Sequence, residues 1–143
     1  MKKTLSLILT LMLALGCAFS FVSCGGNSEV AGTYELTSFA GSVTIDGVTT
    51  TLPADTYEYY IIVINEDGTG VEKAKSAYLT DGAEEKKDFE WELDGNKLLV
   101  SYKMYGVTIT EEMTIENGVI TSEAEVELAE GTSAYMKGTF TKK

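Results

Sequence analysis

Hydrophobic and polar residues alternate along most of the chain after residue 30. In one clear example Phe89, Trp91 and Leu93 alternate with Asp88, Glu90 and Glu92. A period of two residues places neighbouring side chains on opposite faces of a β-strand. Runs of this kind, rich in Val, Ile, Thr and Tyr, predict strands at about residues 31–39, 57–65, 70–79, 86–93, 97–104, 107–116, 119–128 and 134–142, with a minor hairpin over 42–52.

Turn signals such as Asp67-Gly68, Asp94-Gly95 and Asn117-Gly118 separate these runs. Pairs of this type are typical of hairpins that join neighbouring antiparallel strands. Eight sequential strands with one apolar face are expected to close on themselves, because closure removes both unpaired edges. The sequence therefore predicts an all-β fold, an antiparallel up-and-down eight-stranded β-barrel, with an open β-sandwich as the alternative.

The inward face of such a barrel supplies candidate ligand contacts. The residues predicted to line the lumen are Tyr34, Phe89, Trp91, Tyr102, Glu111, Met113 and Phe140. Aromatic residues at these positions more often simply fill a barrel of this size.

Glu111 stands out because it falls on the inward row between Ile109 and Met113. A carboxylate facing an apolar interior is costly unless it is paired or solvated. One interpretation is a group that orients a ligand, with Lys73 or Lys75 as its partner. The alternatives are a hydrated position at the barrel mouth, or a β-bulge at Glu111-Glu112 that turns the side chain outward.

The segment 57–64 is apolar on both faces. If Tyr60, Ile62 and Ile64 point inward, then the outer face, with Tyr59, Ile61 and Val63, needs a second cover. We expect the 42–52 hairpin to lie over that face, and a partner protein is the alternative, since exposed apolar patches often mark interfaces.

The N-terminus has the layout of a secretion signal, with Met1-Lys2-Lys3 followed by an uncharged apolar stretch to Ser23. A stretch of this length is also long enough for an uncleaved membrane anchor. Its end, Phe21-Val22-Ser23-Cys24-Gly25, resembles the lipobox of bacterial lipoproteins, although Phe21 stands where Leu is usual. The resemblance implies that Cys24 is acylated and becomes the first residue of the mature protein. Cys17, which follows Ala14-Leu15-Gly16, is a rival site.

Three segments follow from this interpretation: a signal peptide at 1–23, a lipidated N-terminus and linker at 24–29, and a barrel domain at 30–143. The expected location is outside the cytoplasm, anchored to the cell membrane by lipid.

Composition excludes several functions. After Ser23 there are 9 lysines and 22 acidic residues, a formal side-chain charge of −13, and the chain contains neither Arg nor His. Nucleic acid is therefore not an expected partner, because phosphate binding uses Lys and Arg clusters. The absence of His excludes Ser-His-Asp and Cys-His catalysis, and with no free thiol in the mature protein it also excludes His or Cys sites for zinc and haem. We expect no enzyme activity, no cofactor and no metal.

A family resemblance covers most of residues 30–143. Gly32-Thr33-Tyr34, the turn Asn65-Glu66-Asp67-Gly68-Thr69-Gly70 and the run from Phe89 to Asn96 are similar to the lipocalin-like domains of bacterial surface lipoproteins. True lipocalins carry Trp where this chain has Tyr34 and brace it with an Arg that is missing here. The resemblance implies an eight-stranded barrel whose interior holds a small molecule.

The expected function is thus a lipid-anchored lipoprotein that binds a small apolar or amphipathic ligand. The alternative is an acidic surface protein that engages a basic protein partner, such as an inhibitor of a basic extracellular enzyme, through charge complementarity.

Overall fold

The structure is a computed structural model that describes residues 27–76 and 82–143. The predicted signal peptide and both cysteines lie outside these residues. Within them, no helix has the length and apolar character needed to cross a membrane.

In the part of the chain that the structure describes, nine antiparallel strands follow the short helix α2 (Asn27–Val30). They are β1 (Gly32–Ile45), β2 (Val48–Leu52), β3 (Tyr59–Ile64), β4 (Thr69–Lys75), β5 (Glu84–Asp94), β6 (Lys97–Met104), β7 (Val107–Glu116), β8 (Val119–Ala129) and β9 (Thr132–Lys142). The strands from β3 to β9 pair in sequence order, and β9 returns to pair with β1, which also pairs with β3. The predicted eight-stranded antiparallel barrel is confirmed, with β2 as an additional strand.

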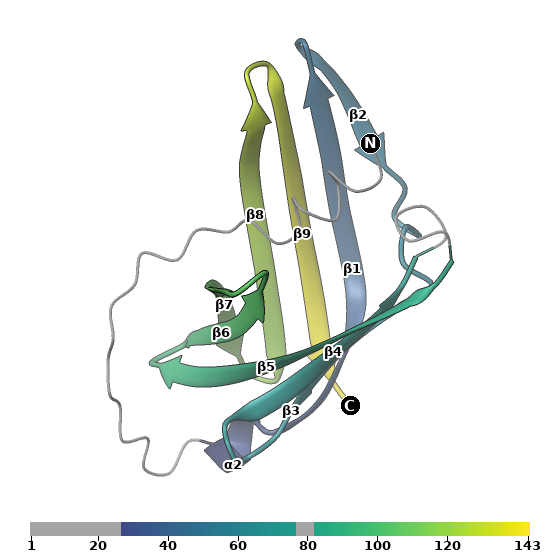
Figure 1. Cartoon of the computed structure of the whole chain (residues 1–143). Coiled ribbons are helices and arrows are strands. Elements are labelled where there is room, and N and C mark those ends of the chain that lie inside the picture. Colours follow the sequence, from purple (N-terminus) through teal and green to yellow (C-terminus); the bar gives the residue numbers. More distant parts are fainter. Residues whose placement is uncertain (1–26, 77–81) are drawn as a thin grey trace.

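β1 is longer than predicted and has two partners on one edge. Gly32–Glu35 pairs with β3, whereas Gly41–Ile45 pairs with β2. On its other edge β1 pairs with β9 along almost its whole length. The far parts of β1, β2, β8 and β9 therefore rise above the remaining strands (Figure 1).

The prediction that the 42–52 hairpin covers the outer face of β3 is wrong. The first arm of that hairpin is the continuation of β1, and β2 extends the same sheet, with Val48 68% exposed. The outer face of β3 is instead flanked by long side chains of neighbouring strands. Ile61 lies between Glu35 of β1 and Lys73 of β4 in the sheet register, and such side chains can cover apolar surface with their methylene groups.

The alternation assigned the faces of the strands correctly. The buried cluster includes the inward residues Ile62, Ile64, Phe89, Trp91, Leu98, Val100, Tyr102, Met113, Ile115, Ile120 and Phe140. The acidic residues on the opposite face are exposed. They include Glu90 and Glu92, which the alternation separates from the apolar side chains, and also Glu112, Glu116, Glu123, Glu125 and Glu127. Val107, on the same row of β7 as Ile109 and Met113, is 62% exposed because it lies at the turn end of the β6–β7 hairpin.

Packing also explains why β4 turns a polar residue inward. The ring of Phe89 lies over Gly70, where an added Cβ would come within 2.2 Å of the ring. Gly70 therefore occupies the inner face, and the period of two residues places Glu72 on the same face.

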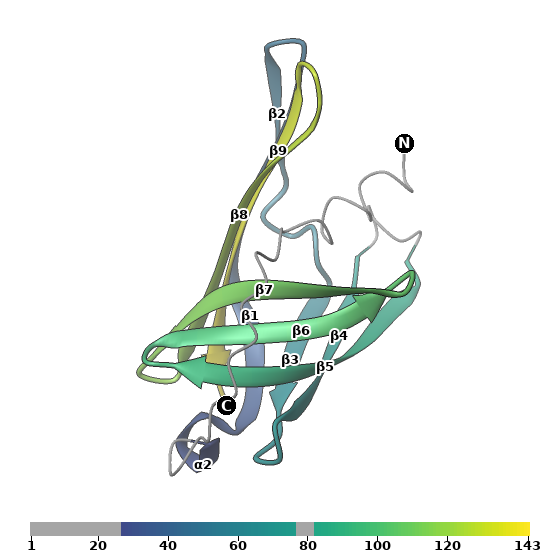
Figure 2. The same cartoon turned by 60° about the vertical axis from the view of Figure 1, so that its left-hand side comes forward.

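The two strands β7 and β8 diverge after a short contact. Only Thr114, Ile115 and Glu116 of β7 pair with β8, where their partners are Thr121, Ile120 and Val119. Beyond these pairs β7 runs with β5 and β6 while β8 rises with β9 (Figure 2). The inner face of the barrel widens into a wedge on this side.

Candidate functional site

A cavity of about 80 Å³ lies within this wedge and continues into open solvent. Its walls come from both sides of the divergence. The lining residues are Leu36, Phe39, Tyr57, Tyr60, Lys87, Glu111, Met113, Ser122, Ala124, Val126, Ala134, Met136, Gly138 and Phe140. The cavity is thus mostly apolar, with one polar end formed by β3, β5 and β7.

One wall is a row of aromatic rings. Phe39 packs edge-on against Tyr57, with ring centroids 5.2 Å apart, and Tyr57 lies 5.2 Å from Tyr60. Tyr60 in turn packs edge-on against Phe140 at 5.0 Å. Edge-to-face contacts in this distance range are favourable arrangements for aromatic pairs, so the row is a fixed surface.

A buried ion pair adjoins the polar end, where Lys87 lines the cavity and Glu72 lies outside the lining. Lys87 Nζ lies 3.0 Å from Glu72 Oε2, and the Tyr60 hydroxyl donates a hydrogen bond of 2.9 Å to the same oxygen. Glu72 is only 5% exposed, and its other oxygen, Oε1, has no hydrogen-bond partner among the described residues. A buried acceptor without a partner is costly and calls for a ligand, an ion or a water molecule to satisfy it.

Glu111 provides a second carboxylate at this end. It accepts a hydrogen bond of 2.6 Å from the Tyr102 hydroxyl. Burial raises the pKa of Glu111 above its ordinary value, the nearby ammonium of Lys87 opposes that rise, and Glu72 adds to it. Lys87 Nζ also lies 3.8 Å from the centre of the Tyr102 ring. Two carboxylates therefore share one ammonium inside the barrel.

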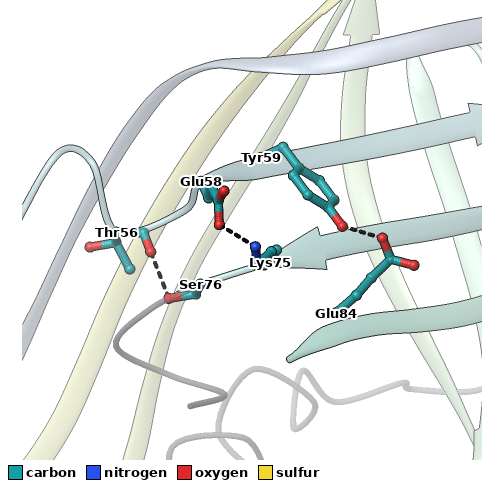
Figure 3. A network of polar contacts seen from close by, with 6 residues as sticks. All are labelled: Thr56, Glu58, Tyr59, Lys75, Ser76 and Glu84. Carbon is teal, nitrogen blue, oxygen red and sulfur yellow. Dashed lines mark hydrogen bonds and ion pairs between the residues drawn. The ribbon is translucent and has the colours of Figure 1, made fainter. Parts of the chain in front are cut away.

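Polar contacts next to Tyr57 hold the segment before β3 in place (Figure 3). Ser76 donates a hydrogen bond of 2.6 Å to the backbone oxygen of Thr56, and both residues are buried. Lys75 forms an ion pair of 2.8 Å with Glu58, and the hydroxyl of Tyr59 donates to Glu84. These contacts tie the chain on both sides of Tyr57 to β4 and β5, and the ring of Tyr57 lines the cavity.

The predicted lumen residues divide into two groups. Glu111, Met113 and Phe140 line the cavity, and Tyr102 bonds to Glu111. Tyr34, Phe89 and Trp91 do not line it and belong to the packed core. Their polar atoms are used within the fold, because Tyr34 donates to the backbone oxygen of Val30 and Trp91 Nε1 to those of Asn65 and Thr69.

The structure excludes one interpretation of Glu111, the β-bulge that turns its side chain outward. The β6–β7 register runs without a bulge through Leu98–Met113 and Val100–Glu111, so Glu111 points inward. The cation beside it is Lys87, and the prediction of Lys73 or Lys75 is wrong. Lys75 is paired with Glu58, and Lys73 lies on the outer face, next in sequence to the inward Glu72.

Sequence reasoning missed Glu72 and Lys87. Lys87 could have been found, because it precedes Phe89, Trp91 and Leu93 at the same spacing of two residues and so falls on the same face of the strand. Glu72 could not have been found, because the apolar Val71 beside it was the better candidate for the inner face of β4. Only the contact of the Phe89 ring with Gly70 shows which of the two faces inward.

The arrangement combines features that are common in small-molecule sites. It offers an apolar wall, an aromatic row and one polar end. In the described residues no group of His, Cys, Asp or Glu side chains is placed to hold a metal ion. Comparisons of this chain with models of protein families, with curated proteins and with solved structures found no match.

Proposed function

We propose that this protein is a binding protein that takes up a small amphipathic molecule in the wedge between β7 and β8. The single observation that carries the proposal is the cavity itself, which has an apolar wall on β8 and β9 and a charged end at Lys87 and Glu111. The lipocalin-like resemblance of the sequence supports the same function, and the barrel is consistent with it.

Cavity size limits the ligand. An engineered cavity of about 150 Å³ admits benzene, so a cavity of about 80 Å³ holds a smaller group. The remainder of a ligand would lie along the opening, against Val126 and Met136. We therefore propose a ligand with a compact head group and a short apolar tail.

Titration calorimetry with three six-carbon probes tests this function. The probes are 1-hexanol, hexylammonium and hexanoate, which share a tail and differ in the head group. We expect saturable 1:1 binding of at least one probe to the purified protein. The variant Ala124→Trp, which fills the cavity from β8, should weaken that binding by about tenfold or more.

Glu125→Trp is the matched control, because Glu125 is the next residue on β8 and is exposed on the outer face. It should bind like the wild type. Absence of binding for all three probes, or equal loss in both variants, would contradict the proposed function.

We further propose that the protein is exported and held at the outer face of the cell membrane by lipid on Cys24. The support is the lipobox-like sequence around that residue. The tether would need more than one acyl chain, because a single chain binds a membrane only marginally.

A second candidate function is supported by the outer surface. The exposed acidic row of β8, Glu123, Glu125 and Glu127, gives one face of the barrel a concentrated negative charge. Such a face favours a basic protein partner. Binding to a cationic protein such as hen lysozyme that weakens steeply with added salt, and that is lost when all three are changed to Gln, would favour this function.

A further inference from the structure

The charges at the polar end of the cavity specify the head group of the ligand. Three charged side chains lie at or next to this end, and two of them, Glu72 and Glu111, are carboxylates, of which Glu111 lines the cavity. The one ammonium, on Lys87, is already engaged by Glu72 and by the ring of Tyr102. When both carboxylates are ionised the cluster has a net charge of −1.

The hydrogen bonds at this end also favour a head group that acts as a donor. The hydroxyls of Tyr60 and Tyr102 are both used as donors to the carboxylates. The atom left without a partner among the described residues is an acceptor, Glu72 Oε1, which is 95% buried with its residue. Glu111, which lines the cavity, also accepts hydrogen bonds when it is ionised. A head group that donates hydrogen bonds therefore suits this end, and a carboxylate or phosphate would add a further acceptor.

The aromatic wall favours a cationic head group. The faces of tyrosine and phenylalanine rings attract cations, and Tyr57, Tyr60 and Phe140 all line the cavity. An anion would meet the carboxylate of Glu111, and the ammonium at this end, on Lys87, is already paired with Glu72.

We infer that the ligand is an organic amine with a short apolar tail, whose protonated head group binds at Glu111 beside the Glu72–Lys87 pair. This inference rests on the proposed function and names the ligand class for the same cavity. The ammonium donates to Glu111, the negative charge of Glu72 behind Lys87 adds to the attraction, and the tail lies against the β8 and β9 wall.

The same three probes test the ligand class. Hexylammonium should bind about tenfold or more tightly than 1-hexanol, and hexanoate should bind most weakly. Glu111→Gln should weaken hexylammonium binding by about tenfold, the effect of losing one charge-assisted hydrogen bond, and should leave 1-hexanol binding unchanged. Glu72→Gln keeps the acceptor for Tyr60 and should weaken hexylammonium in the same sense.

Glu112→Gln is the matched control. Glu112 is the neighbour of Glu111 on β7, is exposed and pairs with Lys97, so its loss changes the net charge of the protein equally without touching the cavity. Thermal unfolding of each variant confirms that it is folded.

The outcomes separate the two proposals. If 1-hexanol or hexanoate binds as tightly as hexylammonium, or if Glu112→Gln weakens hexylammonium as much as Glu111→Gln does, the amine inference is overturned and the binding function stands. If none of the probes binds, both are overturned.

Discussion

Tyr102 donates a hydrogen bond of 2.6 Å to Glu111 across β6 and β7. The two residues are diagonal neighbours, because Tyr102 is opposite Ile109 and Glu111 is opposite Val100. This bond holds the carboxylate against the cavity wall and satisfies part of its need for donors.

Removing that donor should destabilise the protein. Tyr102→Phe keeps the ring under Lys87 and deletes only the hydroxyl, and hydrogen bonds to charged groups contribute about 1.5–3 kcal/mol. We expect a loss of about that size in the free energy of unfolding in urea. The fluorescence of Trp91, the single tryptophan of the chain and 4% exposed, provides the signal.

Tyr105→Phe is the control for this variant. Tyr105 lies in the turn between β6 and β7 and is 89% exposed, so its variant should stay within about 0.5 kcal/mol of the wild type. Equal losses in both variants would contradict a role for the Glu111 bond.

The stability effect of Glu111 should depend on pH. Burial raises the pKa of this carboxyl, Glu72 on β4 adds to the rise, and Lys87 on β5 and Tyr102 on β6 oppose it. The folded state therefore binds a proton at Glu111 more readily than the unfolded state does. The resulting stability is fully present below the unfolded pKa, about 4.3, and is lost as the pH rises through the folded value.

Glu111→Gln removes this titration and can still accept the Tyr102 bond. We expect the stability of the variant, relative to the wild type, to increase as the pH rises from about 4 to about 7. Urea unfolding at several pH values measures the difference. A flat difference for Glu111→Gln would show that the carboxyl titrates alike in both states and would contradict the expected pH dependence.

Gly70→Ala should destabilise the barrel through the Phe89 ring. The added methyl would lie 2.2 Å from the ring and 2.6 Å from the backbone oxygen of Val63, and overpacking of this kind costs about 1–3 kcal/mol. The same substitution in a Phe89→Leu background should cost less, because part of the clash is gone. Additive losses in the double variant would exclude the ring as the cause.

Cys24→Ser should abolish lipid attachment. We expect mass spectrometry of the wild-type protein from bacterial membranes to show an acylated Cys24 as the first residue, and the variant to lack that mass. Cys17→Ser is the control and should keep it. A wild-type protein that retains an unmodified Met1 would contradict the export proposal.

The sequence predicted the strands and their faces well because the alternation is a local property. Phe89, Trp91 and Leu93 reveal their face without knowledge of any partner, and Asn117-Gly118 marks a turn by itself. β1 was predicted too short because Ala40-Gly41 interrupts the apolar pattern, although the backbone pairs with β9 straight through it.

The cavity was less accessible to sequence reasoning. Its position depends on the divergence of β7 and β8, and nothing near Thr121 or Ser122 signals where pairing between those strands stops. Phe39 and Tyr57 join the aromatic row through contacts between segments far apart in the chain, which a pattern of near neighbours does not contain.

Only three residue pairs join β7 to β8, and the volume of the cavity depends on how far this pairing extends. Additional residue pairs between β7 and β8 would bring the two strands closer and reduce the cavity. Fewer pairs would enlarge it. For the proposed binding function, backbone pairing between β7 and β8 would then set the cavity volume, and Glu72, Lys87 and Glu111 would set the preferred charge of the head group. Selection or design could therefore change the size of the ligand without changing its charge.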